Sequence, residues 1–147
     1  MTDGGRHVPR IVVGIDGSVA SLRALRWALG QAESTDAMVE AVTAWDIPTP
    51  YGAGPTVLAG EDLEASARLS LAASVADASA EHPDVEVHQH VLQGHPAPVL
   101  LDQAKGAELL VVGSHGHGGL AGAMLGSVSQ RCTQHATCPV VVVRTRD

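Results

Sequence analysis

Apolar residues follow two alternating patterns along the chain: short continuous runs, and longer stretches in which they recur every three to four positions. The first pattern is typical of buried strands, and the second of helices with one face on a core. The runs that predict strands are 11–15, 38–45, 85–92, 108–113 and 139–143. The stretches that predict helices are 19–33, 61–82, 99–105 and 127–136.

Because strands and helices alternate throughout, the pattern predicts an α/β domain with a parallel sheet and helices on both faces. Within 85–92, three valines alternate with polar residues, which suits an edge strand with one solvated face. These polar residues are Glu86, His88 and His90. Their spacing can also bind zinc, although an exposed polar face explains it without a metal.

The first and fourth predicted strands both end in residues that suit a binding site. Gly14-Ile15-Asp16 closes the first, and Gly113-Ser114-His115-Gly116 closes the fourth. In parallel sheets of this class, ligands bind beyond the carboxyl ends of the strands, where the strand order reverses. If these two strands are neighbours, both segments face one crevice.

A glycine-rich segment joins the fourth strand to the last helix, with Gly113, Gly116 and Gly126-Ser127 in the spacing Gly-x2-Gly-x9-Gly-Ser. Glycine permits close backbone approach, and a helix N-terminus offers free N–H groups and a positive dipole end. The segment therefore predicts a phosphate site. It is not the common phosphate loop, which requires a lysine that this segment lacks. N–H groups, hydroxyls or a metal ion would have to hold the phosphates.

Several of these residues also have purely structural interpretations. Ser127 with Gln130 fits a helix N-cap and capping box, which would explain Ser127 but not the three glycines. Asp16 either stabilises a turn or contacts a nucleoside or Mg²⁺. His115 can meet a phosphate through its ring or its backbone. Ser114 sits in a segment close to the hydrolase nucleophile elbow but lacks its first glycine, so we do not expect a nucleophile.

Composition narrows the functional classes. The chain has 147 residues, 45% of them hydrophobic, and a formal charge of -7, which argues against nucleic acid as the main partner. No apolar run approaches the ~20 residues of a membrane helix. Residues 1–9 predict a flexible polar tail without a secretory signal, preceding a domain over 10–147. Two cysteines, Cys132 and Cys138, are too few for a disulfide framework, and we expect a cytoplasmic protein.

The glycine spacing, the opening Val-Gly-Ile-Asp-Gly-Ser and the closing Cys-Pro-Val-Val-Val-Val resemble the universal stress protein family. The resemblance implies a five-stranded parallel sheet of order 3-2-1-4-5, Rossmann-like, and homodimers that pair through the fifth strand, Val140, Val141, Val142 and Val143. It also implies ATP binding with Mg²⁺ or Mn²⁺, and slow or no hydrolysis. An unpaired edge of four valines invites a second copy on physical grounds as well.

The resemblance also assigns roles to single residues. For ribose and phosphates it implies Val112, Gly113, His115, Gly116, Gly126, Ser127, Val128 and Ser129. For the nucleoside side it implies Gly14, Ile15 and Asp16, with a backbone contact from Ala44 to adenine.

Three functions follow as hypotheses. The first is an ATP-binding regulatory dimer of the stress response. The second is a nucleotide-independent dimeric adaptor, which the intact glycine spacing disfavours. The third is a true ATPase, for which the sequence offers no catalytic residue, no base placed for an attacking water and no lysine for the γ-phosphate.

Overall fold

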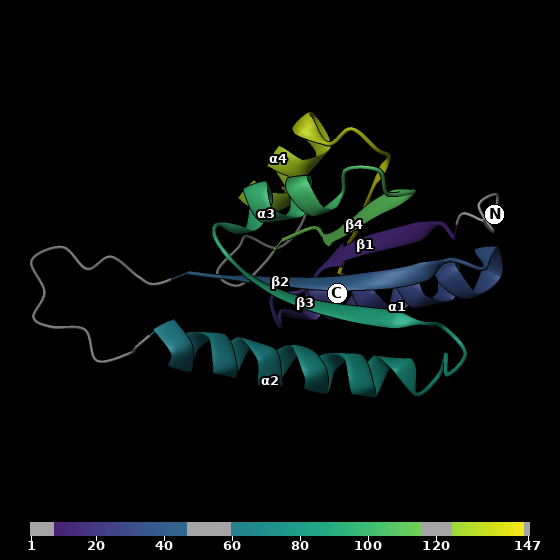
Figure 1. The fold of residues 1–147 in the computed structure, drawn as a ribbon. Helices are drawn as coiled ribbons and strands as arrows, with labels where there is room; N and C mark the ends of the chain where they lie inside the picture. Colours follow the sequence, from purple (N-terminus) through teal and green to yellow (C-terminus); the bar gives the residue numbers. More distant parts are fainter. Residues whose placement is uncertain (1–7, 47–59, 116–124, 146–147) are drawn as a thin grey trace, which may run out of the picture.

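The computed structural model describes residues 8–46, 60–115 and 125–145, and its five strands form one parallel sheet of order β3-β2-β1-β4-β5 (Figure 1). The strands are β1 (Arg10–Gly14), β2 (Met38–Trp45), β3 (Val87–Gln93), β4 (Leu109–Gly113) and β5 (Val140–Val143). The helices are α1 (Val19–Thr35), α2 (Gly60–Ser79), α3 (Pro96–Gln103) and α4 (Ser127–His135). The predicted fold class and strand order are confirmed.

Element boundaries differ from the sequence prediction by at most a few residues. The helix expected from 99 begins at Pro96. Proline fits the first turn because N–H groups there make no hydrogen bond within the helix, so its missing N–H costs nothing. Gly106 lies three residues beyond the end of this helix with a φ of 81°, in the turn that leads to β4. Residues 47–59, between β2 and α2, lie outside the described residues.

Helices cover both faces of the sheet, α1 and α2 on one side and α3 and α4 on the other (Figure 1). The side chains of alternate residues of β1 pack into the two cores on opposite faces of the sheet. Ile11 and Val13 join the α1/α2 core, and Val12 joins the α3/α4 core, all three being at most 1% exposed. A central strand buried on both faces has no solvent side, which explains its continuously apolar sequence.

The two edge strands differ in how they meet solvent. On β3, Val87 and Val91 pack against the α1/α2 core, as the alternation predicts. The opposite face is less open than expected, because the His90 ring is half-buried with Nε2 at 2.9 Å from Glu40 Oε1 on β2. On β5, all four valines are half-buried, and alternate ones pack against the two cores.

β1 lies between β2 and β4 and pairs with both, Val13 opposite Ala41 on one side and Val111 on the other. The direction of chain progression reverses between β1 and β4, so a crevice is expected between their carboxyl ends. In the part of the chain that the structure describes, no helix is long and apolar enough to cross a membrane.

Candidate functional site

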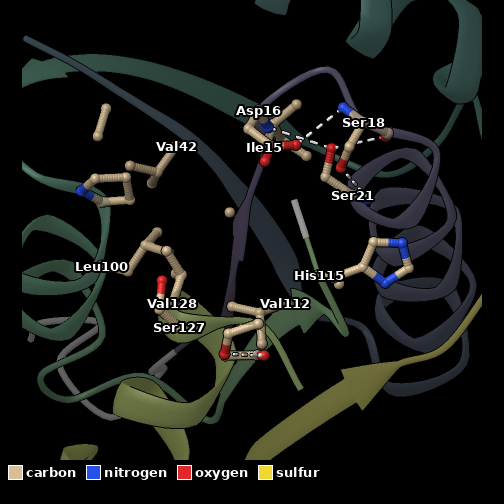
Figure 2. Close-up of a pocket in the computed structure, with 16 residues that line it drawn as sticks. Ile15, Asp16, Ser18, Ser21, Val42, Leu100, Val112, His115, Ser127 and Val128 are labelled. Carbon is tan, nitrogen blue, oxygen red and sulfur yellow. Dashed lines mark hydrogen bonds between the residues drawn. The ribbon is translucent and has the colours of Figure 1, made fainter. Parts of the chain in front are cut away.

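A cavity of about 460 Å³ opens at the carboxyl ends of β1 and β4, between the N-termini of α1, α3 and α4 (Figure 2). Most of the residues proposed from the sequence line it: Gly14, Ile15, Asp16, Ala44, Val112, Gly113, His115, Gly126, Ser127, Val128 and Ser129. Gly116, the remaining one, lies outside the described residues. The structure thus brings together segments that are far apart in the chain.

Five further residues line the cavity that the sequence analysis did not name: Ser18, Ser21, Val42, Pro96 and Leu100. Two signals in the sequence point to them. Side chains two positions apart on a strand share a face, so Val42 belongs with Ala44. In a parallel sheet, each helix that follows a strand also begins near that strand's carboxyl end, which places the starts of the first and third helices here.

The cavity floor depends on the missing side chain of Gly14. A Cβ at this position would stand 2.6 Å from Leu100 Cδ1, closer than real contacts allow. A larger residue at this position would force the Leu100 side chain of α3 to move, so its present place across the end of β1 depends on the glycine. With Val42 on β2, Leu100 gives this side of the cavity an apolar surface (Figure 2).

The turn from β1 into α1 is held by three polar side chains (Figure 2). Asp16 Oδ1 accepts the N–H of Ser18 at 2.9 Å. Ser18 is the N-cap of α1, its Oγ accepting the N–H of Ser21 at 3.2 Å, and Ser21 Oγ accepts the N–H of Asp16 at 3.2 Å. Gly17 between them has a φ of 85°, which favours glycine. Asp16 therefore has the turn-stabilising role, and its exposed side chain also borders the cavity.

The start of α4 differs from the sequence prediction in one respect. Gly126 rather than Ser127 is the N-cap, with extended backbone and no side chain to cap the helix, so the alternative of a capping box formed by Ser127 and Gln130 is wrong. The first helical bond runs from the N–H of Gln130 to the carbonyl of Gly126 at 2.9 Å. The N–H groups of Ser127, Val128 and Ser129 consequently have no acceptor within the helix. They form a group of donors at the cavity wall.

Ser114 links this helix to the sheet. Its carbonyl accepts the N–H of Gly126 at 2.7 Å and the hydroxyl of Ser129 at 2.9 Å, and its own N–H donates to the carbonyl of Val143 at 2.9 Å. Its hydroxyl lies 3.1 Å from Nδ1 of His115, and the residue is 2% exposed. Such burial suits a structural serine, in agreement with the expectation that Ser114 is no nucleophile.

Few charged side chains line the cavity. Among the described residues that line it there is no lysine or arginine, and Asp16 contributes the carboxylate. The described residues also contain no cluster of three or more metal-ligating side chains. His88 pairs with Glu86 and His90 with Glu40, so the zinc alternative gains no support. Among the described lining residues, Asp16 offers the carboxylate oxygens that a divalent cation would prefer.

The two cysteines belong to the α3/α4 core, and both are free. Cys132 on α4 is fully buried, and Cys138 packs against the same cluster. Burial raises the pKa of the Cys132 thiol to about 11, with a smaller contribution from the charge of Cys138. Burial also raises the pKa of Cys138, opposed by its hydrogen bond to the backbone. Both thiols are therefore protonated near neutral pH.

Comparison with known proteins identifies the family of this chain. The model of the universal stress protein family matches residues 7–144. A universal stress protein of Mycolicibacterium smegmatis is 44% identical over 140 residues, covering 92% of this chain and 46% of its own length. One from Mycobacterium tuberculosis is 40% identical over 143 residues, covering 95% and 46%. The chain therefore spans about half the length of the curated relatives it matches.

Solved structures share the fold. A universal stress protein crystallised in complex with cAMP superposes with a TM-score of 0.69 at 26% identity, covering 96% of this chain and all of the other. One from Archaeoglobus fulgidus superposes with a TM-score of 0.72 at 25% identity, covering 97% and 98%.

Proposed function

This chain belongs to the universal stress protein family, and on that premise we propose that its cavity binds an adenine nucleotide and that the protein acts as a nucleotide-dependent regulator of a stress response. The observation that carries the proposal is the uncapped start of α4, whose N–H groups line the same cavity as the ends of β1 and β4. A relative of the same fold binds cAMP, which supports the adenine nucleotide class. We assign this role to the domain over residues 10–147.

The cavity has two chemically distinct regions. Val42, Leu100 and Pro96 give an apolar region that suits a purine ring. The N-terminus of α4 gives a region of N–H donors that suits phosphates. We place the base near Ala44 at the end of β2, the ribose near Asp16, and the phosphates at Gly126 and Ser127.

We further propose ATP as the ligand, with Mg²⁺ or Mn²⁺ bound to its phosphates. A cavity of about 460 Å³ is within the range of small-molecule sites. Hydrolysis is expected to be slow or absent, because no cation of the described lining can stabilise charge on the γ-phosphate, and Oδ1 of Asp16 already accepts a hydrogen bond from Ser18.

Calorimetric titration with AMP, cAMP and ATP plus Mg²⁺ tests the proposal. A Cβ at Gly126 would stand 3.0 Å from the Cα of His115, so Gly126→Val crowds the N–H donors at the start of α4. The variant is expected to weaken nucleotide binding at least about tenfold. Thr133→Val, on an exposed position of the same helix, is the matched control and should bind like the wild type. If no adenine nucleotide binds, the adaptor hypothesis replaces this one. Phosphate release well above background, lost in Ser127→Ala, would favour an ATPase.

We also propose that β5 pairs with a second copy of the chain. β5 is the edge strand next to β4, and its four valines are half-buried. The carbonyls of Pro139 and Val143 accept hydrogen bonds from β4, so by alternation the backbone groups of Val140 and Val142 point outward.

Val142→Pro removes an outward N–H while leaving the β4 side intact, since proline is tolerated on an edge. Light scattering is expected to show a dimer for the wild type and for Val142→Thr, which keeps the N–H, and a monomer for Val142→Pro. A wild type that is monomeric at high micromolar concentration contradicts pairing through β5.

In the cell, we place the protein in the cytoplasm. Its two cysteines are free, which agrees with a reducing compartment.

A further inference from the structure

The hydroxyl of Ser129, in the first turn of α4, is turned into the protein rather than into the cavity. The residue is 2% exposed. Its Oγ donates to the carbonyl of Ser114 at 2.9 Å and lies 3.0 Å from the carbonyl of Gly126. Ser114 follows β4, fifteen residues earlier in the chain, so this hydroxyl joins the two ends of the glycine-rich segment.

A serine hydroxyl carries a single proton, and in Ser129 two carbonyl oxygens already share it. A phosphate at neutral pH presents mainly acceptors. Ser129 could donate to a phosphate only by giving up its bonds to both carbonyls, which would then keep their backbone donors alone, the N–H groups of Gly126 and Gln130. The side chain of Ser129 is therefore poorly suited to be a phosphate ligand, although its N–H group remains suited.

Ser127, two residues earlier, differs from Ser129 in the exposure and the hydrogen bonding of its hydroxyl. It is exposed, it lines the cavity, and its hydroxyl has no hydrogen bond to any residue that the structure describes (Figure 2). Its proton is available to an incoming phosphate without the loss of an internal contact. The two serines of one helical turn thus differ in what their hydroxyls can do.

We propose that Ser129 is a positioning residue whose hydroxyl clamps the start of α4 to the end of β4, beside Ser127, which the proposed function above already places at the phosphates. The clamp acts beside a second bond to the same oxygen, the N–H of Gly126 to the carbonyl of Ser114 at 2.7 Å. Together they fix the direction in which the first N–H groups of α4 point before any ligand arrives. This proposal rests on the nucleotide-binding function proposed above.

A clamp and a ligand contact have different kinetic signatures. Loss of a clamp lowers the fraction of molecules in the binding-competent form, so the apparent association rate falls and the dissociation rate changes little. Loss of a direct contact raises the dissociation rate and leaves association nearly unchanged. A clamp also acts in the protein without ligand, where a contact to phosphate has no effect.

The experiment compares Ser129→Ala, Ser129→Thr and Ser127→Ala with the wild type. Stopped-flow binding of AMP and of ATP with Mg²⁺ gives both rate constants, and NMR amide exchange in the ligand-free protein reports on the N–H of Gly126. For Ser129→Ala we expect association about 3- to 10-fold slower and faster exchange at Gly126. For Ser127→Ala we expect faster dissociation by a similar factor and unchanged exchange. Ser129→Thr keeps the hydroxyl and is expected to restore both readouts.

The proposal is overturned if Ser129→Ala changes only dissociation and leaves exchange at Gly126 as in the wild type, since Ser129 is then a direct ligand. It is also overturned if Ser129→Thr is as defective as Ser129→Ala, because the hydroxyl is then not what matters. Should Ser129→Ala not fold, Ser129→Cys, with a weaker donor of similar size, replaces it in the same two measurements. If the wild type binds no nucleotide, the proposed function fails, and the exchange rate at Gly126 still decides whether the clamp exists.

Discussion

The backbone of Gly113, at the end of β4, lies directly against Ala20 in the first turn of α1. A Cβ placed on Gly113 would stand 2.7 Å from both the Cβ and the carbonyl carbon of Ala20. This close approach brings the N-terminus of α1 to the crevice, where Ser18 and Ser21 line the cavity. The first glycine of the Gly-x2-Gly-x9-Gly-Ser spacing thus has a packing role in addition to any contact with a ligand.

Gly113→Ala should destabilise the protein by about 1–3 kcal/mol, because α1 must move away from β4 to admit the methyl group. Gly30→Ala is the matched control. Gly30 lies in α1, and the nearest atom to a Cβ there is 4.0 Å away, so alanine should be neutral or stabilise by up to about 1 kcal/mol. Urea denaturation measures both changes. Equal stabilities for the two variants would contradict the close approach.

Arg10 should contribute more to stability than an exposed arginine does. Its guanidinium donates to the backbone carbonyl of Gln103 at 3.0 Å and to that of Lys105, at the end of α3, and it lies 3.7 Å from Glu40. Arg10→Ala leaves these carbonyls without their donor and is expected to cost about 1–3 kcal/mol in thermal or urea denaturation.

Arg68→Ala is the comparison for Arg10. Arg68 pairs with Glu64 one turn away on an exposed face of α2, where such pairs contribute at most about 0.5 kcal/mol. A loss for Arg10→Ala no larger than for Arg68→Ala would show that the bonds to the end of α3 do not matter.

Stability should fall in alkaline solution because of the buried thiols. Burial raises the pKa of Cys132 from the ordinary value of 9.0 to about 11, and it raises that of Cys138 as well. Between pH 9 and pH 11 the unfolded chain loses the proton of Cys132 while the folded chain keeps it, so ionisation favours unfolding. This thiol's contribution is complete below pH 9 and decreases by at most about 1.4 kcal/mol per pH unit.

Urea denaturation from pH 7 to pH 11 measures this dependence. Cys132→Ala also leaves a small cavity, so the comparison is between slopes rather than absolute stabilities. The variant is expected to show a shallower alkaline slope than the wild type. Identical slopes above pH 9 would mean that Cys132 has the same pKa in the folded and unfolded states.

Removal of divalent cations should weaken the binding of ATP much more than the binding of AMP. The described lining of the cavity holds the carboxylate of Asp16 and no basic side chain, so a triphosphate needs a cation to offset its charge. We expect EDTA to weaken ATP binding by at least about tenfold and AMP binding by less than about twofold, as measured by calorimetry. Equal weakening of both would locate the cation away from the phosphates.

Much of the fold could be predicted because it depends on patterns within short segments. Continuous apolar runs such as 109–112 mark strands buried on both faces, and glycine spacing marks places where backbone must approach closely. The parallel direction of the strands follows from the alternation of elements, whereas the strand order came from the resemblance to the family. The approximate site followed in turn, because parallel sheets collect their strand ends on one side.

The tertiary structure decided what depends on distance through space. The sequence offered Ser127 as an alternative cap of the last helix, and the family resemblance gave Ser127 and Ser129 the same role. Only the packed structure shows that Gly126 is the N-cap and that the Ser129 hydroxyl reaches back to Ser114. Ser129 rather than Ser127 points inward because the end of β4 lies beside it. The local sequence does not specify where that strand ends. The sequence determined which segments could meet, and the contacts between them determined what each side chain is free to bind.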